Sequence, residues 1–94
     1  MTRRRRDSNQ ADIVAALRAT GASVAVLANV GGGVPDLLVG WRGANLLLEI
    51  KNLDGRGNRL TPAEREFMDT WRGQVAIVED VTGALALLDG KDNS

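Results

Sequence analysis

Three residue types are missing from this 94-residue chain, which contains no cysteine, no histidine and no tyrosine. Without cysteine there is no disulfide, no thiolate zinc site and no cysteine nucleophile. Without histidine, the commonest general base and the histidine-based metal motifs are excluded. The absence of tyrosine excludes a tyrosine nucleophile. Any catalysis must therefore use carboxylates, lysine, hydroxyls and a hard metal ion such as Mg²⁺ or Mn²⁺.

Long apolar runs are also missing, and no segment is long enough to span a bilayer. No apolar segment follows the N-terminal arginines, so we expect no signal peptide. The length suits one domain with a thin core, because a chain of this size buries only roughly 60–65% of its unfolded surface. Small domains often gain further burial by oligomerising.

The net charge is zero, but the charge is distributed unevenly. Residues 1–72 carry a net charge of +3, and residues 73–94 carry −3. The net charge therefore does not indicate a nucleic-acid-binding protein, although its uneven distribution allows a local basic region.

Hydrophobic periodicity and turn residues predict an α/β domain with the order helix, three strands, helix, strand, helix. The expected elements cover residues 9–20, 23–28, 36–41, 45–51, 62–72, 74–78 and 82–88. Asp7 or Ser8 is expected to cap the first helix. Residues 1–6 are expected to form a basic flexible tail, residues 7–90 a single domain, and residues 91–94 a frayed C-terminus.

Charged residues lie at the ends of two adjacent apolar strands. Asp36 opens the second expected strand, whereas Glu49 and Lys51 close the third. A tight turn near Gly43 would pair these strands as a hairpin and set Asp36 opposite residues 49–51. Side chains alternate along a strand, so Glu49 and Lys51 share one face. We therefore expect Asp36, Glu49 and Lys51 to converge at one end of the hairpin.

Two carboxylates and a lysine suit phosphodiester hydrolysis. Asp36 and Glu49 could hold a divalent cation, which activates water and polarises a phosphate. Lys51 could orient the water or stabilise negative charge in the transition state. The carbonyl of Ile50 is a candidate for a further oxygen ligand. The alternative interpretation is an ion pair on a solvated sheet face.

Residues 33–39 (GVPDLLV) and 46–51 (LLLEIK) resemble the motifs of the PD-(D/E)xK nuclease superfamily. The chain is most similar to its small VRR-NUC-type and Holliday-junction-resolvase-like nucleases, often encoded by phages. The resemblance covers nearly all of residues 7–88. It implies a restriction-endonuclease-like αβββαβ core with a mixed four-stranded sheet flanked by helices. It also implies Mg²⁺ or Mn²⁺ bound by Asp36 and Glu49, with Lys51 serving the attacking water. A cytoplasmic location, in a bacterium or a phage-infected cell, is the matching expectation.

Two positions depart from the pattern of that superfamily. Gln10, Ile13 and Gly21 match a spacing in the first helix, but Gln10 stands where a glutamate is frequent. An amide can position water or phosphate but binds metal more weakly than a carboxylate. Gln10 is thus either a catalytic-site residue or a polar residue that satisfies the helix start. Residues 60–64 resemble the family's second helix start, where Glu64 stands in place of the usual glutamine.

Several residues are candidates for contact with DNA. Arginines in the N-terminal run and in the loop after Lys51 can bind phosphates, although each group can also be simply solvated. The glycine run at 31–33 allows either close DNA approach or a turn. The DNA-binding candidates are Arg5, Arg6, Gly32, Gly33, Arg56 and Arg59. Phe67 and Trp71, one helical turn apart, are expected in the core rather than as base-stacking groups.

These observations favour a metal-dependent DNA endonuclease, with branched DNA as one candidate substrate. A domain this small covers little DNA, so we expect a homodimer or higher homo-oligomer, or recruitment by a larger assembly. The first alternative is a non-catalytic nucleic-acid-binding or assembly module that retains the fold. The second is a structural oligomerisation domain, in which the three charged residues form an ion network.

Overall fold

The computed structural model describes residues 5–52 and 59–92, with side chains described for 9–52 and 59–90. The observed order of helices and strands is the predicted one. The elements are α1 (Arg5–Ala19), β1 (Ser23–Val26), β2 (Leu37–Trp41), β3 (Ala44–Ile50), α2 (Pro62–Thr70), β4 (Val75–Val78) and α3 (Val81–Asp92). The expected tail residues 1–4, the loop at 53–58 and residues 93–94 lie outside the described part of the chain.

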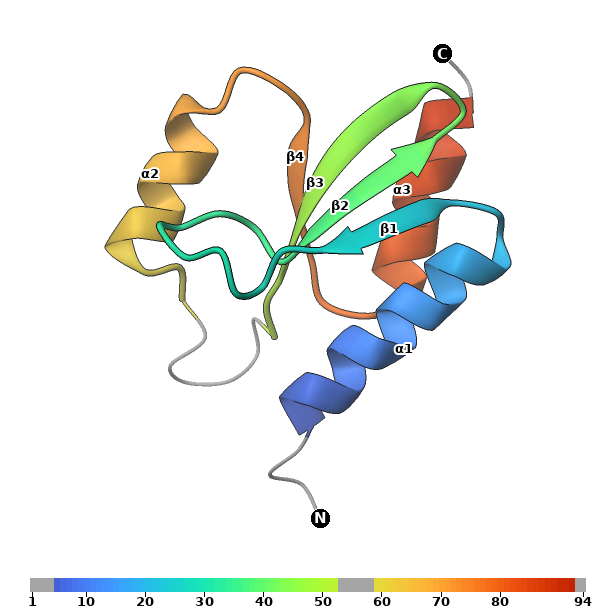
Figure 1. Ribbon diagram of the computed structural model, residues 1–94, viewed down its shortest axis with the longest axis horizontal. Helices are drawn as coiled ribbons and strands as arrows, with labels where there is room; N and C mark the ends of the chain where they lie inside the picture. Colours follow the sequence, from blue (N-terminus) through green and yellow to red (C-terminus); the bar gives the residue numbers. More distant parts are fainter. Residues whose placement is uncertain (1–4, 53–58, 93–94) are drawn as a thin grey trace.

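The sheet contains four strands in the order β1-β2-β3-β4. The pairs β1–β2 and β2–β3 are antiparallel, and β4 runs parallel to β3. The expected α/β class with a mixed four-stranded sheet is therefore confirmed. Figure 1 shows α1 and α3 on one side of the sheet and α2 on the other. Helix α2 lies in the crossover connection between β3 and β4, which a parallel pair of strands requires.

The hydrophobic core lies between the sheet and the pair α1 and α3. Helix α1 contributes Ile13 and Leu17, both fully buried, as the helical periodicity predicted. Strands β2 and β3 contribute alternate residues, and α3 contributes one small residue and one larger aliphatic residue. The strand and α3 residues of this core include Leu37, Val39, Leu46, Leu48, Ile50, Ala84 and Leu88.

Helix α1 ends where the sequence indicated but begins earlier. Gly21 takes a φ of +103°, and the amide of Ala22 donates to the carbonyl of Leu17 at 3.2 Å, a closing bond typical of a glycine-ended helix. The start expected near residue 9 was wrong, because the helix already includes Arg5 and Arg6. Arginine is a good helix former and no glycine or proline interrupts this segment.

That earlier start also removes Asp7 and Ser8 as cap residues, since both lie inside α1. The end of α3 differs in the same direction. This helix continues to Asp92, beyond the end expected at residue 88. Asp80 caps its start, with the Oδ1 atom accepting from the amide of Gly83 at 2.9 Å.

A two-residue turn joins β2 to β3. Arg42 and Gly43 both have positive φ, at 51° and 85°, as required by the type I′ turn that matches strand twist. Trp41 then pairs with Ala44, and Leu37 pairs with Leu48. The register of the hairpin is thereby fixed along its whole length.

Helix α2 contributes no buried residue to the core. Phe67 and Trp71 stack on each other with ring centroids 4.9 Å apart, and Trp71 is 46% exposed. The expectation that both rings belong to the core was therefore wrong. With Leu38 and Leu47 they line a groove of about 410 Å³ between α2 and the sheet.

The outer strand β1 is covered in part by α1. The guanidinium of Arg18 donates to the carbonyl of Val24 at 2.9 Å. At the N-terminal end of α1, the side-chain amide of Asn9 donates to the backbone carbonyl of Glu79, just after β4, at 2.9 Å. Among the helices described here, none is long and apolar enough to cross a membrane.

Candidate functional site

The β2–β3 hairpin brings Asp36 next to the end of β3. Leu37 pairs with Leu48, so the preceding residue, Asp36, lies across from Glu49. The Oδ2 atom of Asp36 accepts a hydrogen bond from the amide of Ile50 at 2.9 Å. Its own carbonyl accepts from the amide of Leu27 at 2.7 Å. Asp36 is thus held between the end of β3, which the predicted hairpin sets opposite it, and the residue that follows β1.

Glu49 in β3 and Lys51 directly after it project from the face opposite the core. They alternate with Leu48 and Ile50, which are buried toward α1 and α3. Both charged residues are themselves nearly inaccessible, at 3% for Glu49 and 8% for Lys51. The amide of Lys51 donates to the carbonyl of Val78 at the end of β4. An inner strand therefore presents these charges where water has little access.

A third carboxylate, Glu64 of α2, completes the cluster. Its Oε1 atom lies 2.9 Å from the Nζ atom of Lys51, whereas Glu49 Oε2 lies 3.8 Å from the same nitrogen. Glu64 also accepts from the amide of Thr61 at 2.9 Å. The sequence identified Glu64 only as a cap and as a departure from a family motif. The sequence signal that could have suggested a link to the site is its position at a helix start soon after Lys51.

The cluster perturbs the protonation of both glutamates. Burial, followed by the negative charges of Asp36 and Glu64, raises the pKa of Glu49 to about 7, although Lys51 acts in the opposite direction. Burial also acts to raise the pKa of Glu64, but hydrogen bonds from Thr61 and Lys51 outweigh it and lower that pKa. Near neutral pH, Glu64 is the ionised partner of Lys51, and Glu49 is close to its titration point.

The donor set fits a hard divalent cation held mainly by two carboxylates. Asp36 keeps one oxygen outside its bond to Ile50, and Glu49 is buried with a destabilised negative charge. Among the described residues, no three acidic groups are arranged to hold a metal ion. Mg²⁺ commonly binds one or two carboxylates and keeps several waters. A role for the carbonyl of Ile50 as a ligand stays a prediction.

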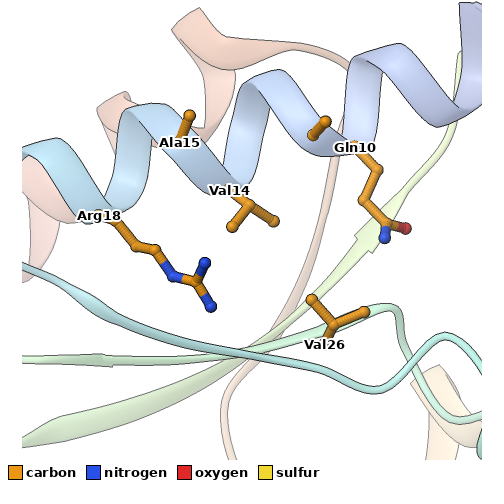
Figure 2. A pocket seen from close by; sticks show the side chains of 6 residues that line it. Gln10, Val14, Ala15, Arg18 and Val26 are labelled. Atoms are coloured by element: carbon orange, nitrogen blue, oxygen red, sulfur yellow. The ribbon is translucent and has the colours of Figure 1, made fainter.

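Gln10 projects from α1 into a groove beside β1. The groove has a volume of about 480 Å³. Figure 2 shows its side chain directed from α1 toward Val26, with Val14 and Arg18 along the same groove. Within the described part of the chain, Gln10 forms no hydrogen bond with Asp36, Glu49 or Lys51. The role of Gln10 in the site stays a prediction.

The glycine run positions α2 against the site. A Cβ atom on Gly33 would collide with the carbonyl group of Ala63 and lie 3.0 Å from the amide of Glu64. Gly33 therefore permits a close approach between this loop and the start of α2. Gly31 and Gly32 have open space at the same position.

The arginines expected to contact DNA differ in how far the structure describes them. Arg59 is exposed just before α2. Arg5 and Arg6 belong to the first turn of α1, but their side chains lie outside the described part of the chain, and so does Arg56.

No protein family, curated protein or solved structure matches this chain in comparisons with known proteins. The resemblance to the PD-(D/E)xK superfamily thus depends on the short motifs at 33–39, 46–51 and 60–64, together with their order.

Proposed function

We propose that this protein is a metal-dependent DNA endonuclease that hydrolyses phosphodiester bonds. The observation that supports the proposal best is the meeting of Asp36, Glu49 and Lys51 at one end of the hairpin. Glu49 is only 3% exposed there, and an inner strand gains nothing in stability from a buried, poorly compensated carboxylate.

Charge balance in the cluster favours a bound cation. With all groups ionised, Asp36, Glu49 and Glu64 carry three negative charges against the single positive charge of Lys51. Negative charge on the buried Glu49 is unfavourable, and burial followed by the charges of Asp36 and Glu64 raises its pKa to about 7. A hard divalent cation beside Asp36 and Glu49 would compensate that negative charge and leave water molecules in the coordination sphere.

The proposed reaction is the addition of water to phosphorus with cleavage of one P–O ester bond. When bound, Mg²⁺ or Mn²⁺ lowers the pKa of a coordinated water molecule and neutralises negative charge on the phosphate. Asp36 and Glu49 would hold the cation. The ammonium of Lys51 would donate hydrogen bonds to the attacking water or to a phosphate oxygen as negative charge develops.

The test is cleavage of branched and linear DNA with Mg²⁺ or Mn²⁺ by the intact chain. Asp36→Asn and Lys51→Met preserve side-chain size while removing the charge, and Asp12→Asn on the exposed side of α1 is the matched control. We expect each site variant to lose at least about 100-fold in rate, with the control unchanged. Equal rates in all four proteins would overturn the assignment.

The identity of Gln10 and the zero net charge favour one alternative, a module that binds nucleic acid or assists assembly without catalysis. Gln10 stands where a glutamate is frequent in the superfamily, and an amide binds metal more weakly than a carboxylate. Salt-dependent DNA binding with no metal-dependent cleavage would support this alternative. Absence of Mn²⁺ binding at millimolar concentration by calorimetry would instead favour a purely structural ion network.

A further inference from the structure

Glu64 serves two structural purposes with one carboxylate oxygen. Its Oε1 atom accepts from the amide of Thr61 at 2.9 Å and from the ammonium of Lys51 at 2.9 Å. In return, the hydroxyl of Thr61 accepts from the amide of Glu64 at 3.1 Å. This reciprocal pair is a capping box at the start of α2. Glu64 therefore belongs to the helix start and to the charged cluster together.

The shortest ion pair of Lys51 is the one with Glu64. At 2.9 Å the contact is a charge-assisted hydrogen bond, whereas the 3.8 Å separation from Glu49 is too long for one. Lysine has a long flexible stem, so its ammonium needs a partner to stay in one place. Glu64 supplies that partner from α2, an element distinct from β3, which ends just before Lys51.

Two further contacts fix where the Glu64 carboxylate stands. The capping box orients the side chain relative to the first turn of α2. The close approach of Gly33 to Ala63 then sets that turn against the loop that precedes Asp36. The loop, the helix start and the strand end thus meet around the ammonium of Lys51.

We infer that Glu64 is a positioning residue for Lys51, holding its ammonium beside Glu49 and coupling the start of α2 to the site. The inference concerns the placement of Lys51; its effect on DNA cleavage rests on the proposed function. A glutamine at position 64 could still close the capping box but would lose the charge that holds the lysine.

The chain offers a direct test because it has only two lysines, Lys51 and Lys91. Each lysine can be acetylated by a small amine-reactive ester at fixed pH and followed by mass spectrometry, with Lys91 as internal reference. In Glu64→Gln we expect the labelling of Lys51 relative to Lys91 to rise roughly five-fold, the difference between a charged and a neutral hydrogen bond.

Thr61→Ala is the matched control for loss of helix stability. It removes the hydroxyl that caps the amide of Glu64, but it keeps the backbone amide that holds the Glu64 carboxylate. We expect Lys51 labelling in Thr61→Ala to stay close to that of the unmodified chain. An equal rise in both variants, or no rise in Glu64→Gln, would overturn the inference.

Cleavage assays separate this inference from the proposed function. If the natural chain cleaves DNA, Glu64→Gln should lower kcat roughly ten-fold by misplacing Lys51, with little change in KM. If the natural chain does not cleave DNA, the proposed function fails while the labelling result still decides the role of Glu64. Cleavage by the natural chain with unchanged labelling in Glu64→Gln would overturn only the inference.

Discussion

Glu49 links the charged cluster to the stability of the fold. Its pKa is raised from 4.5 to about 7, chiefly by burial. The folded protein therefore binds more protons than the unfolded chain between these values. The stabilisation that comes from the protonation of Glu49 is fully present below about pH 4.5 and is lost as the pH rises through 7.

Glu49→Gln should remove this pH dependence. The amide keeps the size of the side chain and cannot ionise, so the variant should resemble the natural protein at pH 5. At pH 8 it should be more stable by up to about 3 kcal/mol, the free energy equivalent of the pKa shift. Urea unfolding at both pH values measures the difference. Glu66→Gln, at an exposed position of α2, is the control, and equal behaviour of the two variants would contradict the expectation.

The meeting of Asp36 with Glu49 and Lys51 was predictable because it follows from local rules. Strand alternation puts Glu49 and Lys51 on one face, and a short turn at Gly43 fixes which residue faces Asp36. The contact of Glu64 with Lys51 follows from no local rule. It depends on how α2 packs against the sheet, which involves residues distant in the sequence and a backbone approach at Gly33.

The connection between β1 and β2 controls the placement of α2. Ala at position 33 would take a φ of +82° and bring its Cβ atom against the backbone of Ala63. Position 32 has a φ of +67° but open space. The two positions therefore separate the cost of a left-handed backbone from the cost of a backbone collision.

Gly33→Ala should consequently be much more destabilising than Gly32→Ala. We expect a loss of about 1–2 kcal/mol at position 32 from the backbone conformation alone. At position 33 the loss should be at least about twice as large, because the start of α2 must also move. Urea unfolding of both variants measures the two losses. Equal losses in the free energy of unfolding would contradict a destabilising collision with Ala63.

The capping box makes a separate contribution to α2. Thr61→Ala should lower the free energy of unfolding by about 1 kcal/mol, because the amide of Glu64 loses its acceptor. Thr70→Ala, at the exposed last residue of the same helix, should change stability by less than about 0.5 kcal/mol. Thermal unfolding followed by circular dichroism compares the two. A larger loss at position 70 would contradict this role of Thr61.

Helices and strands were easier to predict in order than in extent. Pro62 with Thr61 and Glu64 fixed the start of α2 through side-chain bonds that the sequence displays. At the start of α1 the apparent caps Asp7 and Ser8 were misleading, because good helix formers extend the helix to Arg5. The end of α3 passed through Gly90, which a short-range pattern takes as a stop.

The molecule is unevenly stabilised across its sheet. One face is covered by α1 and α3 through fully buried residues such as Ile13 and Leu48. The other face is covered by α2, which buries none of its own residues. Local opening should therefore begin at α2.

Amide hydrogen exchange should reveal this difference. The amides of α2 should exchange at least about ten-fold faster than those of the α1 segment around Ile13 and Leu17 and those of β3, since few buried apolar contacts hold α2. Exchange followed by NMR or mass spectrometry at pH 7 measures it. Uniform protection across α1, β3 and α2 would contradict the expectation and would mean that something further covers α2 in solution.

The bond from Arg18 to the carbonyl of Val24 has a consequence for how copies of this chain can meet. A strand at the border of a sheet is a template on which another chain can add a strand. Arg18 occupies a backbone acceptor of β1 and brings a positive charge to that border. Addition of another strand at β1 would have to displace this arginine, so the bond from Arg18 disfavours edge-to-edge association of β1.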